Sequence, residues 1–258
     1  MKKIITHDGL FHADEVFAIA LLLETRYEVP IHRTRDKSAM DTFLRDPDVF
    51  VLDVGGEYDV VYHNFDHHQK DYTEGDATNM LVLRWLNANG YISNGLYEAL
   101  LIPFKAISII DINGYDGFNG YQVNSLIKSL NFVKNGWELA LDLARSVIKA
   151  YVSRELGKER SLHIWNTALT VEGTSIKIVS QFPSEWKSYS DATFLIEDTQ
   201  KDDIYSQGGI KVHSADATKF PIKSTGKETF LHKGRFLAAF NSIADAIECA
   251  KLSLDALT

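Results

Sequence analysis

The sequence predicts an α/β protein, with a doubly wound, mostly parallel sheet domain joined by a long helix to a smaller α+β domain. Three observations support this fold class. Short apolar runs alternate with helical patterns in the first half of the chain, one long helical pattern follows, and strand patterns dominate the last third. Strands that are apolar on both faces and alternate with helices are typical of parallel sheets covered on both sides.

The elements of the first half are bounded by recognisable start and stop signals. Predicted strands cover Lys3–Thr6, Val29–Thr34 and Val49–Val54, and Gly55-Gly56 stops the last of them. Predicted helices cover Glu15–Tyr27, Ser38–Leu44 with Ser38 as its cap, and Asn79–Asn89, which ends at Gly90. The apolar run Ala106–Asp111 fits a helix or a strand.

The second half begins with a helical pattern from Trp137 to Gly157, which we interpret as the connector between two domains. We expect a catalytic domain over residues 1–135, a connecting helix over 136–160 and a substrate-binding domain over 161–258. The elements expected in the last domain are two strands about a glycine turn in Ala168–Val179, strands at Ala192–Ile196, Ile210–His213 and Glu228–Leu231, and an amphipathic helix at Ala244–Leu257.

Composition limits the classes of function. Apolar runs such as Ala18–Leu23 are too short to cross a bilayer, and from the opening residues we expect no apolar signal region. The single cysteine, Cys249, excludes an internal disulfide and a cysteine-rich zinc site, so we expect a cytoplasmic protein without a membrane partner. The formal net charge of −8 argues against a large duplex-DNA surface, but it allows a nucleotide, an oligonucleotide or pyrophosphate.

The residues that carry chemistry are concentrated in a few places. Four of the nine histidines lie in the segments Thr6–Glu15 and Phe65–Gln69, and Asp53 and Asp111 each end an apolar run. Loops at the carboxyl ends of strands in an open α/β sheet meet at one crevice. We therefore expect six metal ligands to converge there: His7, His12, Asp14, Asp53, His67 and Asp111.

The mixture of imidazole and carboxylate ligands predicts the kind of metal site. Such ligands suit Mn²⁺, Fe²⁺, Co²⁺ or Zn²⁺, and six of them exceed what one ion normally uses. They suffice for two ions that share a bridging carboxylate, as in many phosphoester-cleaving sites. Isolated histidines such as His32, His163 and His213 are interpreted as ordinary surface or core residues, and the four tryptophans as core rather than base-stacking residues.

Taken together, these motifs resemble the MYG (melanocyte proliferating gene) family of the DHH phosphoesterase superfamily. The resemblance lies in Thr6-His7-Asp8-Gly9, Phe11-His12-Ala13-Asp14-Glu15, Arg33-Thr34-Arg35-Asp36, Asp53-Val54-Gly55-Gly56 and Phe65-Asp66-His67-His68-Gln69, and in the later segment Phe230–Phe236. The superfamily's first motif commonly carries two aspartates, where this chain has His12 and Asp14. Gly208-Gly209 precedes Ile210, so a Gly-Gly-His substrate loop is missing.

The resemblance implies roles for individual residues. Asp53 would bridge two divalent ions, expected to be Mn²⁺ with Mg²⁺, Co²⁺ or Zn²⁺ as alternatives. His68 would be the acid or phosphate-binding group, and Asp66 would orient its neighbours. The substrate-binding residues implied are Arg35, Asp36, His232 and Arg235.

The expected function is therefore that of a metal-dependent phosphoesterase. The resemblance implies a 3′–5′ exonuclease that hydrolyses phosphodiester bonds of short single-stranded RNA or DNA through a water activated by two metal ions. Two alternatives stay open. One is a small-molecule phosphohydrolase acting on pyrophosphate or a (cyclic) dinucleotide, and the other is a catalytically idle metal-binding module. A homodimer is compatible with the sequence.

Overall fold

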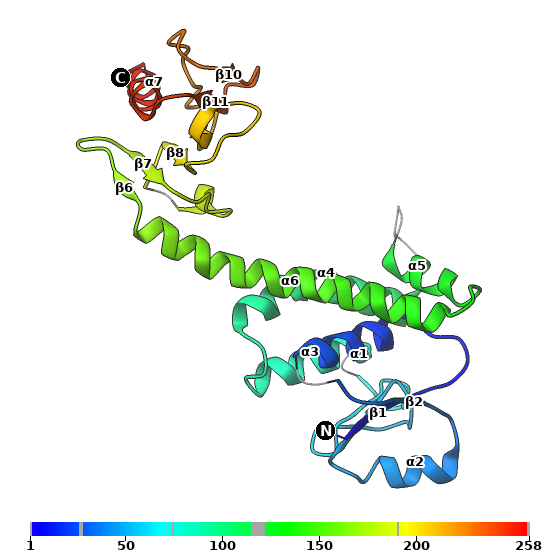
Figure 1. Ribbon diagram of the computed structural model, residues 1–258. Helices are drawn as coiled ribbons and strands as arrows, with labels where there is room; N and C mark the ends of the chain where they lie inside the picture. The colour runs from blue at the N-terminus through cyan, green and yellow to red at the C-terminus, as the bar shows by residue number, and fades with distance from the viewer. Residues whose placement is uncertain (1, 26–27, 74, 115–121, 190, 257–258) are drawn as a thin grey trace. The chain divides into compact units, whose positions relative to one another are not determined.

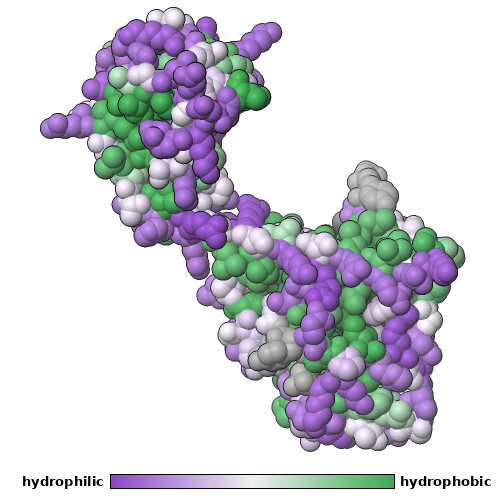
Figure 2. Space-filling view, in the orientation of Figure 1, coloured by the Kyte–Doolittle hydropathy of each residue, from purple (hydrophilic) through white to green (hydrophobic). Residues whose placement is uncertain are grey.

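The computed structural model describes residues 2–25, 28–73, 75–114, 122–189 and 191–256. The chain forms two compact units, Met1–Glu155 and Leu156–Thr258, and the division falls within the long helix α6 (Gly136–Asn166) (Figure 1). Hydrophilic side chains cover much of the visible surface of each unit, with apolar groups between them (Figure 2). In the part of the chain that the structure describes, no helix is both long and apolar enough to span a membrane.

Unit 1 is built on a five-stranded sheet with the order β2-β1-β3-β5-β4. Its strands are β1 (Lys3–Thr6), β2 (Ile31–Arg33), β3 (Val49–Leu52), β4 (Tyr58–Asp59) and β5 (Asn64–Phe65). β1 pairs in parallel with β2 and β3, β3 pairs in parallel with β5, and only the edge strand β4 is antiparallel to its neighbour. The sheet is therefore mostly parallel.

Side chains of the central strands alternate between two apolar layers. Ile4 and Phe50 lie in the large core shared with α1 (Ala13–Thr25) and α3 (Thr78–Ala88). Ile5 and Val51 lie in a smaller cluster with Met40 of α2 (Lys37–Phe43). Helices thus cover both faces, which explains why β1 and β3 are apolar throughout. The α/β class is confirmed, and the finer doubly wound arrangement stays a prediction.

A layer of helices completes unit 1. It comprises α4 (Asn94–Asn113), α5 (Val123–Leu130) and the first part of α6. Ala140, Ala144 and Ile148 are fully buried at four-residue spacing, so one stripe of α6 packs on the core. Because these helices lie outside it, α1 is buried nearly all round, and its Ala- and Leu-rich sequence follows from that position.

Unit 2 contains a six-stranded sheet with the order β10-β11-β9-β8-β7-β6. Its elements are β6 (Leu169–Thr170), β7 (Ile176–Val179), the 3₁₀ turn η1 (Trp186–Ser188), β8 (Phe194–Asp198), the 3₁₀ turn η2 (Gln207–Gly209), β9 (Ile210–Ser214), β10 (Phe230–Leu231), β11 (Leu237–Phe240) and α7 (Ile243–Asp255). Helix α7 covers one face through Ala246, Cys249 and Ala250, and Trp165 and Trp186 lie in a cluster with Leu195 on the other.

Two local predictions were wrong, and one run that fitted either a helix or a strand proves to be helical. Helix α6 continues through Gly157 to Asn166, since one glycine costs a helix only about 1 kcal/mol and good helix formers follow it. The cap of α2 is Asp36, whose carboxylate accepts a hydrogen bond from the Ser38 amide, so Ser38 is not the cap. The run Ala106–Asp111 belongs to a helix, α4.

Other elements were not predicted, and two predicted helix ends lie outside the residues that the structure describes. The strands β4, β5 and β11, each two to four residues long, and the helix α5 were not predicted. The predicted helix ends at Tyr27 and Leu257 lie outside the described residues. The predicted three-part division of the chain stays a proposal.

Candidate metal centre

The candidate ligands come from one edge of the unit 1 sheet and from two helices. His7 follows β1, Asp53 follows β3, and Asp66-His67-His68 follow β5. Asp14 lies in the first turn of α1, and Asp111 lies near the end of α4. The expectation that every ligand follows a strand was wrong for Asp14 and Asp111, because the helices also reach this edge.

Asp53 stands at the centre of the cluster. Its Oδ2 lies 3.3 Å from His7 Nε2, and its Oδ1 lies 3.4 Å from His67 Nδ1 and 3.5 Å from His68 Nδ1. Thr78 Oγ1 donates a hydrogen bond to the same Oδ1 at 3.2 Å. The backbone of Asp53 is left-handed, with φ of 59°. Aspartate tolerates this conformation better than most residues, and here it ends β3 where the carboxylate is buried.

Glu15 belongs to the cluster, although it was not among the predicted ligands. Its Oε1 lies 3.1 Å from His7 Nε2, and its two oxygens accept hydrogen bonds from the His12 amide at 2.8 and 2.9 Å. His12 immediately precedes α1, so Glu15 has the third helical position of a capping box. That spacing was the available signal, but it indicates a helix cap and does not by itself indicate a ligand.

Asp14 is the least satisfied group of the cluster. Its side chain is fully buried, and neither carboxylate oxygen has a hydrogen-bond partner. Burial, and then the nearby charges of Asp53, Asp111 and Glu15, raise the pKa of Asp14 well above its usual range. Several carboxylates buried together without a cation are unfavourable. The donor set therefore fits a bound divalent metal ion.

Asp111 connects the remaining histidines to the cluster. Its Oδ2 lies 3.1 Å from His67 Nε2, and its Oδ1 lies 3.9 Å from His12 Nδ1. Within the described residues, three groups place ligand atoms within 4.8 Å of one another: His7, His12, Glu15 and Asp53; Asp53, Asp66, His67 and His68; and His12, Asp14 and Asp111. All six predicted ligands thus lie in one cluster, with Asp53 shared between two of the groups.

The same cluster gives His7 an unusual protonation equilibrium. Burial disfavours the charged imidazolium, but hydrogen bonds to Asp53 and Glu15 outweigh it and raise the pKa of His7 to about 10. In the metal-free protein the positive charge of protonated His7 partly offsets the negative charge of the neighbouring carboxylates, as a bound metal ion would.

Asp66 organises the backbone that carries the two following histidines. Its Oδ1 accepts hydrogen bonds from the amides of His67 and His68 at 2.8 and 3.1 Å, and its Oδ2 accepts one from the Gly56 amide at 2.6 Å. It also lies 2.7 Å from His68 Nδ1. Although burial opposes ionisation, these contacts lower the pKa of Asp66. Asp66 therefore fixes the backbone of His67 and His68 and contacts the His68 ring.

His68 differs from the other histidines of the cluster in its exposure. Its side chain is 58% exposed, whereas that of His67 is 8% exposed. The hydrogen bond to Asp66 raises the pKa of His68 above its ordinary value. His68 is therefore the histidine of the cluster most open to solvent, and its hydrogen bond to Asp66 favours the protonated imidazole.

Two residues without a predicted role hold the loop between β1 and α1. Arg33 donates hydrogen bonds to the carbonyl oxygens of His7 (3.1 Å) and Gly9 (2.8 Å), and its guanidinium stacks 4.4 Å from the Trp137 ring centroid. The side chain of Asn131 accepts from the Phe11 amide at 2.9 Å and donates to the Phe11 carbonyl at 2.8 Å. The loop that supplies His7 and His12 is thus fixed from both sides.

The four predicted substrate-binding residues lie in different places. Arg35 donates a hydrogen bond to the carbonyl of Asp8 and lies beside this loop, whereas Asp36 caps α2. His232 and Arg235 lie in unit 2, on the turn between β10 and β11. The structure brings only Arg35 close to the loop of the metal centre within unit 1.

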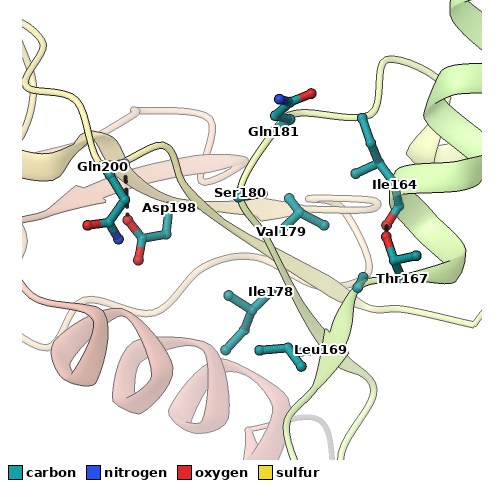
Figure 3. Close-up of a pocket in the computed structure, with 10 residues that line it drawn as sticks. Ile164, Thr167, Leu169, Ile178, Val179, Ser180, Gln181, Asp198 and Gln200 are labelled. Carbon is teal, nitrogen blue, oxygen red and sulfur yellow. Dashed lines mark hydrogen bonds between the residues drawn. The ribbon is translucent and has the colours of Figure 1, made fainter.

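A cavity of about 440 Å³ opens beside the cluster. Its lining residues are His12, His67, His68, Tyr72, Thr73, Gly75, Asp111 and Ile112. A separate cavity of about 320 Å³ lies in unit 2, where Asp198 accepts a hydrogen bond from the Gln200 amide (Figure 3). Its described lining is mostly aliphatic and amide, with one carboxylate and without histidine, so it lacks a metal donor set.

Residues 3–83 match the MYG1_exonuc family model, described as "Uncharacterised protein family (UPF0160)". The N-terminal segment is therefore similar to this family. The predicted resemblance is thus confirmed for the segment that holds His7, Asp53 and the Asp66-His67-His68 motif. The matched segment contains every candidate ligand except Asp111 of α4.

Individual MYG1 relatives match over the same part of the chain. The MYG1 protein of Chlamydia trachomatis is 41% identical over 101 residues, which cover 38% of this chain and 33% of the relative. The human MYG1 exonuclease is 47% identical over 74 residues, or 28% of this chain and 18% of the relative. The matches therefore span about a third or less of the length of these relatives.

Solved structures similar to the whole chain are distant. A pGpG-specific phosphodiesterase, PggH, from Vibrio cholerae aligns over 100% of this chain and 99% of its own with a TM-score of 0.36 and 12% identity. RecJ from Thermus thermophilus, solved in complex with Mn²⁺, covers 99% of this chain and 52% of its own with a TM-score of 0.32 and 12% identity. Similarity at this level adds no detail to the site.

Proposed function

We propose that this protein is a metal-dependent phosphodiesterase, and that it acts as a 3′–5′ exonuclease on short single-stranded RNA or DNA. The observation that carries the proposal is the buried, unpartnered carboxylate of Asp14 within a cluster of carboxylates and imidazoles beside an open cavity. The exonuclease name of the mammalian relatives, which match over 74 residues, supports the choice of substrate.

Two ion positions are compatible with the ligand groups. His7, Glu15 and Asp53 would hold one ion, and His12, Asp14 and Asp111 would contribute to a second, with His67 between Asp53 and Asp111. Divalent ions supply positive charge to phosphoryl oxygens and lower the pKa of water. We expect Mn²⁺ because the donors mix nitrogen and oxygen, with Mg²⁺, Co²⁺ or Zn²⁺ as alternatives.

The chain's own residues then position and protonate the substrate. His68, held through its Nδ1 by Asp66, would bind a phosphoryl oxygen or donate a proton to the leaving oxygen. Arg33 and Asn131 keep the loop of His7 and His12 in place, so that the ligands need little reorganisation on binding. Asp53 would be the shared carboxylate.

The turn between β10 and β11 carries the proposed substrate contacts of unit 2. His232 lies 4.0 Å from Phe236 and 6.3 Å from Phe230 between ring centroids, and Tyr205 lies 4.7 Å from Phe230. Lys233 and Arg235 are exposed beside this row of rings. Aromatic rings interleaved with cations are typical of single-strand binding surfaces.

We expect the double substitution of Phe236 and Arg235 by alanine to weaken binding of single-stranded RNA about 10-fold or more, because a stacking contact and a phosphate contact are lost together. Fluorescence anisotropy with a labelled oligonucleotide at fixed salt measures the affinity. Substituting Lys251, exposed on α7, by alanine provides the control. Equal affinities for the double variant and the wild type would contradict a role for this turn.

The function is tested with purified protein, Mn²⁺ and 5′-labelled single-stranded RNA. The expected result is a ladder shortened from the 3′ end with release of nucleoside monophosphates. Phosphate release from pyrophosphate, or cleavage of a dinucleotide without cleavage of longer RNA, would favour a small-molecule phosphohydrolase. Metal binding without turnover of any of these would indicate an idle metal-binding module. A cytoplasmic location and a homodimer stay proposals.

A further inference from the structure

We infer that the cavity beside the metal centre binds a nucleobase, and that the ring of Tyr72 is its stacking surface. The inference rests on the proposed function and adds the part of the substrate that lies next to the phosphate. It starts from the division of the cavity lining into two chemical halves. One half is His12, His67, His68 and Asp111 of the metal centre, and the other contains the ring of Tyr72 and the side chain of Ile112.

Tyr72 is held in a fixed orientation. Its hydroxyl donates a hydrogen bond to the carbonyl of Asp76 at 2.6 Å. Its ring meets the ring of His67 edge to face at 6.4 Å between centroids, and that of Tyr58 at 6.3 Å. An aromatic ring held by its hydroxyl and by neighbouring rings loses little conformational entropy when a ligand stacks on it.

The anchor of Tyr72 is itself rigid. The Asp76 side chain is fully buried, and its two oxygens each lie 2.6 Å from a cation, Lys105 on one side and Arg84 on the other. The next residue, Ala77, donates its amide hydrogen to Ser108 Oγ at 2.8 Å. The segment that presents Tyr72 is therefore tied to both α3 and α4.

The second half of the lining offers no favourable contact to a bare phosphate. Ile112 is 39% exposed at the cavity although it is apolar, and none of the described lining residues is a lysine or an arginine. A phosphate-only substrate would gain from the metal centre but would leave this apolar wall exposed to water. A nucleotide places its phosphate at the metal centre and its flat base against the wall, and the volume suits a ligand of that size.

The experiment uses the full chain with Mn²⁺ and two single-stranded oligonucleotides that differ only in the terminal 3′ residue, which carries a base or an abasic sugar. We expect Tyr72→Ala to lower kcat/KM about 5- to 150-fold for the base-bearing substrate, the range of one stacking contact, and to leave the abasic substrate unchanged. Tyr72→Phe, which keeps the ring, should retain most of the activity on the base-bearing substrate. Equal losses on both substrates, or no loss on either, would overturn the inference.

A binding measurement separates this inference from the proposed function. Titration with a fluorescent purine nucleoside monophosphate, with ribose 5-phosphate as the ligand without a base, needs no turnover. Weaker binding of the purine nucleotide to Tyr72→Ala than to the wild type, with equal binding of ribose 5-phosphate, supports the nucleobase site even if neither oligonucleotide is hydrolysed. Equal binding of the purine nucleotide to both proteins would overturn it. If the wild type hydrolyses neither oligonucleotide, that result would count against the nuclease function alone.

Discussion

Replacing Asp53 by asparagine is expected to lower kcat/KM about 10³-fold or more and to weaken Mn²⁺ binding, because one carboxylate faces His7, His67 and His68 from the centre of the cluster. Several kcal/mol of transition-state stabilisation depend on the bound ions, and each 1.36 kcal/mol is about tenfold in rate. Asparagine is nearly isosteric with aspartate and also accepts a left-handed backbone, so the end of β3 should keep its conformation.

The measurement pairs steady-state kinetics with Mn²⁺ titration by calorimetry. Asp41→Asn is the matched control, because this substitution makes the same change of charge. Asp41 is exposed on α2 and belongs to none of the ligand groups. Circular dichroism should show both variants folded. An Asp53→Asn protein within tenfold of wild-type activity, with unchanged Mn²⁺ affinity, would rule out the central position given to this carboxylate.

Asp14→Asn should change stability in opposite directions with and without metal. Asp14 is fully buried, has no hydrogen-bond partner and lies among three other carboxylates. In EDTA, replacing this buried carboxyl group, whose ionisation folding disfavours, should raise the free energy of unfolding by roughly 1–3 kcal/mol, since the asparagine amide can donate to a neighbouring carboxylate. Saturating Mn²⁺ should stabilise the wild type by about 2.7 kcal/mol at a hundred times its Kd, and the variant by much less.

Thermal unfolding with and without Mn²⁺ measures both effects. For a chain of this size the expected shifts are several degrees, so the wild type should melt below the variant in EDTA and above it in Mn²⁺. The reversed order of the two melting temperatures matters more than the size of either shift. If Asp14 had a purely structural role, its substitution would destabilise the protein under both conditions. A variant that is less stable than the wild type in EDTA would contradict the account of Asp14 as an unpaired metal ligand.

The parts of the site that the sequence predicted follow from local rules. The buried strands β1 and β3 show as apolar runs, and parallel strands bring their carboxyl ends to one edge, so His7 and Asp53 could be placed together in advance. The roles of Glu15, Arg33 and Asn131 could not be predicted from the sequence. Glu15 is recognisable only as a cap, and Asn131 reaches Phe11 across 120 residues of chain. Contacts of that kind depend on tertiary packing and leave no periodic signal.

The errors in the fold, and the one run left open between a helix and a strand, have a similar origin. The apolar run that ends at Asp111 has no period that separates a buried strand from a buried helix, and α4 continues through Pro103 and includes it. Gly157 looks like a helix end, but the stop signal is weak where helix-forming residues continue on both sides. Short strands such as β5 and β11 are specified by their neighbours in the sheet, because two to four residues carry too little pattern of their own.

Anomalous diffraction from crystals grown or soaked with Mn²⁺ tests the central claim most directly. Manganese peaks are expected inside the cluster, one bounded by His7, Glu15 and Asp53 and one bounded by His12, Asp14 and Asp111, both lost in Asp53→Asn crystals treated in the same way. Fully occupied manganese elsewhere on the protein, with no peak among these residues, would contradict the claim.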